Sequence, residues 1–198
     1  MYQFQCDYNE GAHQRIMERL LETNFEQTVG YGEDQYCAQA RETIKSVVGR
    51  YDVDVHFLVG GTQANATVIS SILRPHQGVL CADTGHFNVH ETGAIEHIGH
   101  KALALKHANG LLAAETIREA MEEHLAEDGP EHTVQPGMVY ISFSSEVGTV
   151  YSLQQLKEIA EELKKQRKVY TYADLARILD VQRGDLSQMM SGKRPVSK

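Results

Sequence analysis

The stretch "GVLCADTGHFNVHETGAIEHIGH", residues 78–100, opens with an apolar run that ends at an aspartate and a Thr-Gly-His turn. A short apolar run bounded by turn residues is typical of a strand buried on both faces. The runs "DVHFLVG" (residues 54–60), "KALALK" (101–106) and "MVYISFS" (138–144) have the same character. Strands of this kind need helices on both sides of their sheet, and the sequence around them supplies such helices.

Amphipathic spacing of apolar residues predicts these helices between and around the strands. Gly49 is placed to end one of them, and Ser152 with Gln155 forms a capping box at the start of the last. Strands that alternate with helices indicate an α/β domain with a mainly parallel sheet. The predicted helices cover residues 11–24, 34–49, 64–73, 113–127 and 152–166.

A glycine-rich turn, Gly60-Gly61-Thr62, joins the run at 54–60 to the helix that follows it. The start of a helix carries unpaired N–H groups and a partial positive charge, which favour an anion. Two glycines let a ligand approach the backbone, and Thr62 adds a hydroxyl donor and a cap. The turn therefore suits a phosphate. Taken alone, the motif is a weak signal, and a tight turn with a threonine cap explains it as well.

The histidines that follow residue 85 raise the question of a metal site. His86 and His90 stand one helical turn apart beside Glu91, as some zinc ligands do. Glycines interrupt the segment, and no third ligand stands at a suitable spacing. We therefore predict no metal, and packing or surface roles for His97 and His100.

The charge of the chain is divided unevenly. Residues 164–198 carry nine Lys and Arg against three Asp, whereas the first 163 residues carry ten against 24 Asp and Glu. A body this acidic disfavours general nucleic-acid binding, but the basic end can contact phosphates. An apolar span, a secretory leader and paired cysteines are all missing from the sequence, so we expect a cytoplasmic protein without membrane contact.

Several motifs in one order resemble the N-terminal half of low-specificity threonine aldolases and related β-eliminating lyases. These motifs are "CDYNEGAH", "VGYGEDQY", "DVHFLVGGTQAN", "CADTGHFNVHETGAIE" and "MVYISFSSEVGTVYSLQQL", within about residues 4–165. The resemblance implies part of the large domain of a fold type I pyridoxal-phosphate enzyme, over residues 1–165. It further implies a homo-oligomer that acts on a small amino-acid substrate, cleaving β-hydroxy-α-amino acids to glycine and an aldehyde.

The resemblance also assigns roles to individual residues. Gly61 and Thr62, with Gly60 beside them, would hold the cofactor phosphate, and His86 would stack on the pyridine ring. Asp174 would pair with the ring nitrogen, with Arg177 as its neighbouring arginine. Tyr31 would lie in a loop near the active site or a subunit boundary. Cys6 departs from the family, where many members have a serine or asparagine that contacts the substrate carboxylate.

One expected feature of the family is missing from these 198 residues. The family forms a Schiff base with the cofactor through a lysine in a Gly-Thr-Lys context, and Lys193 in "SGKRP" matches it only superficially. The catalytic lysine is thus unassigned. The sequence is expected to be a truncated aldolase with impaired turnover.

The basic tail, defined as residues 166–198, also permits a second interpretation. Its pattern resembles the helix-turn-helix of phage-repressor-like proteins, which would direct side chains toward a DNA groove and its phosphates. The helix-turn-helix interpretation and the aldolase interpretation assign different structures to Asp174–Arg177. We favour the helix-turn-helix for the local structure of the tail. A DNA-binding protein built on an aldolase-derived domain is therefore the alternative function. The residues that would contact DNA are Arg183, Ser187, Gln188, Lys193 and Arg194.

Overall fold

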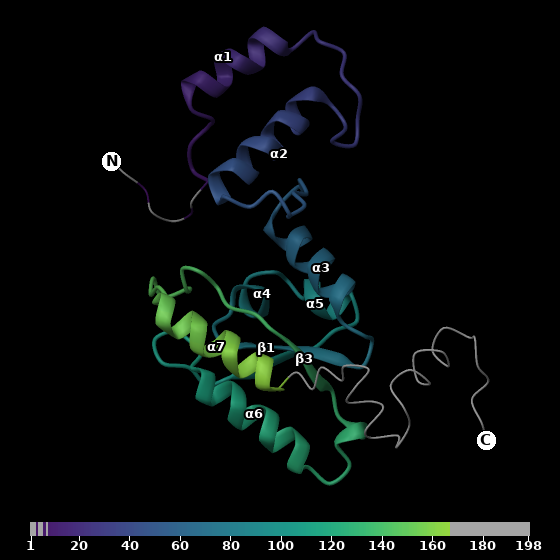
Figure 1. The fold of residues 1–198 in the computed structure, drawn as a ribbon, viewed down its shortest axis with the longest axis vertical. Helices are drawn as coiled ribbons and strands as arrows, with labels where there is room; N and C mark the ends of the chain where they lie inside the picture. The colour runs from purple at the N-terminus through teal and green to yellow at the C-terminus, as the bar shows by residue number, and fades with distance from the viewer. Residues whose placement is uncertain (1–2, 4–5, 7, 167–198) are drawn as a thin grey trace, which may run out of the picture. The chain divides into compact units, whose positions relative to one another are not determined.

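The computed structural model describes residues 3, 6 and 8–166, which divide into two compact units with a boundary after Leu58 (Figure 1). The second unit, from Val59 onward, contains the sheet. The predictions for the basic tail, including Asp174, Arg177 and the DNA contacts, lie outside the described residues. Among those that are described, no helix is long and apolar enough to cross a membrane.

Within the described residues, the sheet has three parallel strands in the order β2-β1-β3. β1 (Gln77–Ala82) is central, and β2 (Ala102–Leu105) and β3 (Gln135–Val139) flank it. The helices that connect and cover them are α3 (Gly61–Ile72), α4 (His86–Val89), α5 (Ala94–His97), α6 (Ala114–Ala126) and α7 (Leu153–Gln166), with a short 3₁₀ turn η1 (Pro130–His132). The predicted α/β class with a parallel sheet is confirmed.

Side chains of β1 alternate between two apolar cores. Val79 and Cys81 pack against α3, α4 and α5, whereas Leu80 and Ala82 pack against α6 and α7. Figure 1 shows these two groups of helices on opposite sides of the sheet. Burial raises the pKa of the Cys81 thiol to about 11, so it stays protonated within the core. The uninterrupted apolar run of β1 is thus explained by burial on both faces.

Two glycines of the sheet, Gly78 in β1 and Gly137 in β3, stand where neighbouring atoms approach the backbone closely. A Cβ built on Gly78 would lie 2.7 Å from the carbonyl oxygen of Lys101, and one on Gly137 would lie 2.7 Å from Leu73 Cδ2. The β1–β3 register shifts between Gly78 and Val79, beside Pro136 in β3. Proline is accommodated here because β3 is an edge strand next to an irregularity.

Two predicted strands need correction. The strand predicted at 138–144 is displaced, because β3 begins at Gln135 and ends at Val139. The run at 54–60 forms no strand in the structure. A strand requires a partner for its backbone groups, and no ladder within the described residues includes this run. Val59 is 95% exposed, which fits an unpaired segment at the boundary between the units.

The first unit contains two of the predicted helices, α1 (Gln14–Thr23) and α2 (Gln35–Val48). Gly49 ends α2 in the left-handed conformation, with φ of 69°, as expected for a C-cap. Among the described residues, neither helix has a buried side chain. The apolar face of α1 is exposed at Ile16, Met17, Leu20 and Leu21.

Tyr151 and the capping box of α7 fix the start of the last described helix. The Ser152 backbone N–H donates to Gln155 Oε1 at 2.9 Å, and the Gln155 N–H donates to Ser152 Oγ at 3.2 Å, as predicted. Directly before it, the Leu112 N–H donates to the hydroxyl oxygen of Tyr151 at 2.7 Å. Both residues are buried, so this hydrogen bond has no competition from water.

Removing the Tyr151 hydroxyl should therefore destabilise the fold. Tyr151→Phe leaves the buried Leu112 N–H without an acceptor, which should lower the free energy of unfolding by about 1–3 kcal/mol. The measurement is urea denaturation followed by circular dichroism. The matched control is Tyr51→Phe, because Tyr51 is 67% exposed. Equal effects of the two substitutions would contradict the role given to this hydrogen bond.

Candidate functional site

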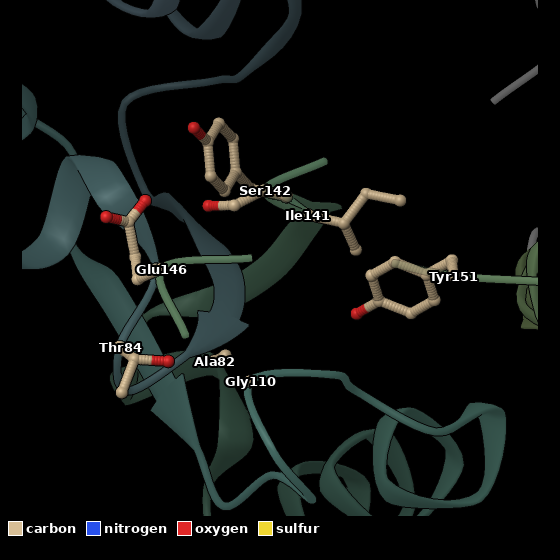
Figure 2. A pocket seen from close by; sticks show the side chains of 9 residues that line it. Ala82, Thr84, Gly110, Ile141, Ser142, Glu146 and Tyr151 are labelled. Carbon is tan, nitrogen blue, oxygen red and sulfur yellow. The ribbon is translucent and has the colours of Figure 1, made fainter. Parts of the chain in front are cut away.

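The carboxyl ends of β1 and β3 bring two polar segments together. β1 ends at Ala82 and β3 at Val139, so the turn before His86 and the residues up to Ser142 follow at the same edge of the sheet. The His86 backbone N–H donates to Ser142 Oγ at 3.3 Å and joins the two segments. Figure 2 shows a small pocket at this edge, with the Ser142 and Glu146 side chains among those that line it. Such an edge is the usual place for a ligand in an α/β fold.

His86 contacts a carboxylate from a distant part of the chain. Its Nδ1 lies 3.0 Å from Glu146 Oε1, and the Nε2 of His90 lies 3.6 Å from Glu146 Oε2. The two imidazole rings are 5.3 Å apart between centroids and tilted by 48°. The His86 side chain is 48% exposed, so about half of it is open to a ligand.

Tyr140 lies between this cluster and the start of α3. Burial raises the pKa of its hydroxyl, the carboxylates of Glu91 and Glu146 add to that effect, and Ser142 and Asn65 oppose it. Its ring packs edge-to-face on Phe87, with 4.6 Å between centroids. The phenol therefore stays protonated and neutral at neutral pH.

The first turn of α3 borders an open groove of about 650 Å³. The groove is lined by Gly60, Gly61 and Thr62 and, across from them, by residues 91–94, His97 and Ile98. Gly60 is the N-cap and provides no side-chain hydrogen bond. The Gly61, Thr62 and Gln63 N–H groups have no acceptor among the described residues, whereas the Ala64 N–H bonds to the Gly60 carbonyl. The predicted capping role of Thr62 is therefore wrong, because Thr62 is already the second residue of the helix.

The geometry of this turn suits a phosphate. A Cβ built on Gly60 or Gly61 would meet no atom within 4 Å, so the space in front of the turn is open. Three unpaired N–H groups at the positive end of a 12-residue helix supply the donors that an anion needs. The residues present fit a phosphate group.

A buried glutamate, Glu91, connects α3 with the opposite wall of the groove through a hydrogen bond. The Asn65 side-chain amide donates to Glu91 Oε1 at 2.7 Å, and Glu91 is 6% exposed. Glu91 Oε2 is buried and has no hydrogen-bond partner among the described residues. The bond between Asn65 and Glu91 holds the first turns of α3 against the segment that joins α4 to α5.

A third histidine at this edge of the sheet, His107, has a structural role. The Gly110 N–H donates to His107 Nδ1 at 2.7 Å, so this nitrogen carries no proton and His107 Nε2 is the donor. Nε2 lies 2.9 Å from Asp83 Oδ1 and 3.3 Å from Thr84 Oγ1. Both ring nitrogens are thus occupied, and His107 connects the loops that follow β1 and β2.

The remaining predicted site residues are less constrained. Tyr31 belongs to the first unit, where it is fully exposed in a turn with φ of 63°. Asp174 and Arg177 fall outside the described residues. The part of the chain that the structure describes holds no group of three or more His, Cys, Asp or Glu side chains able to bind a metal ion.

Four polar residues of the site are not among the sequence-predicted ones. They are Asn65, Glu91, Ser142 and Glu146. Glu91 is visible in the sequence only as a neighbour of the histidine pair. The others carry no local signal, because their partners lie 26 to 60 residues away in the chain.

Comparisons with known proteins agree with the predicted resemblance. The profile of the beta-eliminating lyase family matches residues 3–191. A low specificity L-threonine aldolase of a Pseudomonas species is 30% identical over 165 residues, and one of Pseudomonas aeruginosa is 29% identical. Each match covers 82% of this chain and 46% of the relative, so the chain spans about half the length of these relatives.

A solved structure supports the same assignment. A threonine aldolase of Leishmania major is 41% identical, with a TM-score of 0.76, over 81% of this chain and 46% of that one. The likeness confirms the expected partial fold type I architecture. Members of this group of enzymes depend on pyridoxal phosphate. With its fold, its ordered motifs and a profile match over most of its length, this chain belongs to the beta-eliminating lyase family.

Proposed function

We propose that this chain provides part of the active site of a threonine-aldolase-type lyase, which cleaves β-hydroxy-α-amino acids to glycine and an aldehyde. The observation that carries the proposal is the first turn of α3, where three residues whose N–H groups have no acceptor in the described part of the chain line an open groove. Family membership identifies the expected anion as the phosphate of pyridoxal phosphate. When bound, this cofactor supplies a ring that accepts the electrons released at the substrate α-carbon.

The residues of the chain would then hold and orient the reacting groups. Gly61 and Thr62 would bind the phosphate through backbone N–H groups and the Thr62 hydroxyl, and Gly60 would leave room for it. His86 would pack its flat ring against the pyridine ring. Asp174 would accept a hydrogen bond from the ring nitrogen and keep that nitrogen protonated, with Arg177 beside it. Tyr31 would belong to the substrate loop.

Assembly with a second copy fits the same proposal. The exposed apolar face of α1, at Ile16, Met17, Leu20 and Leu21, leaves a surface that an oligomer would cover.

Substitutions at the first turn of α3 test the phosphate site. Gly61→Asp should abolish cofactor binding, because a carboxylate there repels the phosphate while it favours the helix. Thr62→Ala should weaken binding roughly tenfold through loss of one hydrogen bond to a charged group. Binding is measured by titration with pyridoxal phosphate, followed by absorbance.

Two controls make this test specific. Thr67→Ala changes an exposed threonine on the same helix and should leave the affinity unchanged. Pyridoxal, which lacks the phosphate, should bind the wild type and the Gly61→Asp variant with equal affinity. A loss that is the same for both compounds would refute the assignment of this turn to the phosphate.

The lysines of the chain provide a second test. None of them stands in a Gly-Thr-Lys context, so we propose that this chain binds the cofactor without a covalent bond and turns over substrate poorly. Borohydride reduction of the cofactor-saturated protein should leave its intact mass unchanged. A stoichiometric adduct would overturn this expectation, and peptide mapping would then identify the lysine.

DNA binding by the basic tail remains a second proposal, favoured by the reversal of charge after residue 163. Replacing Arg183 and Arg194 by alanine in the full chain should weaken DNA binding and reduce its dependence on salt. Fluorescence anisotropy with labelled duplex DNA at several salt concentrations measures both effects. Absence of salt-sensitive binding by the wild type would exclude this function.

A further inference from the structure

We propose that Glu146 is a positioning residue that sets the tautomer and the orientation of the His86 ring. The inference rests on the proposed function, in which His86 packs against the cofactor ring. It assigns a role to a residue that neither the motifs nor the comparisons single out.

The contact itself determines where the His86 proton lies. An ionised carboxylate only accepts hydrogen bonds, so the imidazole nitrogen 3.0 Å from Glu146 Oε1 must be the donor. Nδ1 therefore carries the proton, and Nε2 of the neutral ring is left as the acceptor. Positioning carboxylates hold histidines in other enzymes and metal sites in the same way.

Glu146 lies in a turn that several hydrogen bonds hold in place. The Ser145 N–H donates to the Thr149 carbonyl at 2.9 Å, and the Gly148 N–H donates to the Ser145 carbonyl at 2.9 Å. Gly148 has φ of 81°, a conformation that favours glycine. Ser145 is 6% exposed, and the Thr149 hydroxyl donates to the Asn109 carbonyl at 2.5 Å. The turn is thus anchored to the loop after β2, and Glu146 cannot follow His86 freely.

His86 is held at two independent places. Its backbone N–H bonds to Ser142 Oγ, and its ring bonds to Glu146. In Figure 2 the Glu146 and Ser142 side chains both line the pocket at this edge of the sheet. The backbone and the ring of His86 are therefore both held by residues that follow β3, which limits the orientations open to the imidazole.

His90 contacts the same carboxylate less closely. Its Nε2 lies 3.6 Å from Glu146 Oε2, beyond ordinary hydrogen-bond length, and its side chain is 57% exposed. Removing His90 should accordingly leave the His86 tautomer unchanged. This asymmetry supplies an internal control for the experiment.

The test is the tautomer of His86 in the cofactor-free full chain, observed by long-range ¹H–¹⁵N NMR at a pH where the ring is neutral. The wild type should show the Nδ1-protonated form, and Glu146→Ala should lose it. Glu146→Gln keeps an acceptor oxygen and should retain this form. His90→Ala and the surface substitution Glu123→Gln are the controls, and His86→Gln assigns the resonance. An Nε2-protonated His86 in the wild type, or a tautomer unaffected by Glu146→Ala, would overturn the proposal, and the wild-type spectrum decides this even if a variant does not fold.

Cofactor affinity gives a second readout. Glu146→Ala should weaken the binding of pyridoxal phosphate and of pyridoxal by the same factor, on the order of tenfold. The substitution affects the contact with the pyridine ring and leaves the contact with the phosphate unchanged. A loss confined to pyridoxal phosphate would contradict the proposal. If the wild type binds neither compound, the proposed function fails, whereas the tautomer measurement still decides the role of Glu146.

Discussion

Burial of β1 on both faces is the constraint on which the second unit depends. Val79 and Cys81 fill one core, and Leu80 and Ala82 fill the other, so a single strand connects the two helical layers. Each layer buries apolar surface only while β1 stays in register with its neighbours. The same register pairs Val139, the last residue of β3, with Leu80 near the end of β1, and the candidate site lies where the chain leaves these two strands.

The polar residues at this edge form a chain of contacts with different tasks. Asn65 and Glu91 hold α3, whose first turn offers free N–H groups, while Ser142 and Glu146 hold His86. Tyr140 lies between these two pairs, with a raised hydroxyl pKa that keeps it neutral. The first turn of α3 and the His86 ring are thus held by separate contacts, and the proposed function assigns them to the two ends of a single cofactor.

Local patterns in the sequence predicted β1, β2 and the helices α1, α2, α3, α6 and α7, because an apolar run or an amphipathic spacing carries its own signal. The short helices α4 and α5 were not predicted, since one turn of helix is too short to show such a spacing. The strand at 54–60 was wrong because pairing depends on a neighbour, which composition does not reveal. The predicted position of β3 was displaced because Pro136 and Gly137 are uncommon in strands and hide its first half in the sequence. In the structure, Pro136 is tolerated at the edge of the described sheet, and Gly137 is needed because Leu73 packs against it. His86 and the Gly60–Thr62 turn were predicted from motifs. Glu146 and Asn65 were not, since only the tertiary fold brings them to their partners.

The close approach at Gly78 has a consequence for comparing relatives of this chain. Its neighbours include the Lys101 carbonyl oxygen and Val134 Cγ1, both within 3 Å of where a Cβ would stand. A backbone oxygen cannot rotate away as a side chain can. A homologue with any larger residue at the equivalent of position 78 must therefore separate its first two strands at that end. The residue that a homologue has at this one position therefore indicates whether the strand spacing described here applies to it.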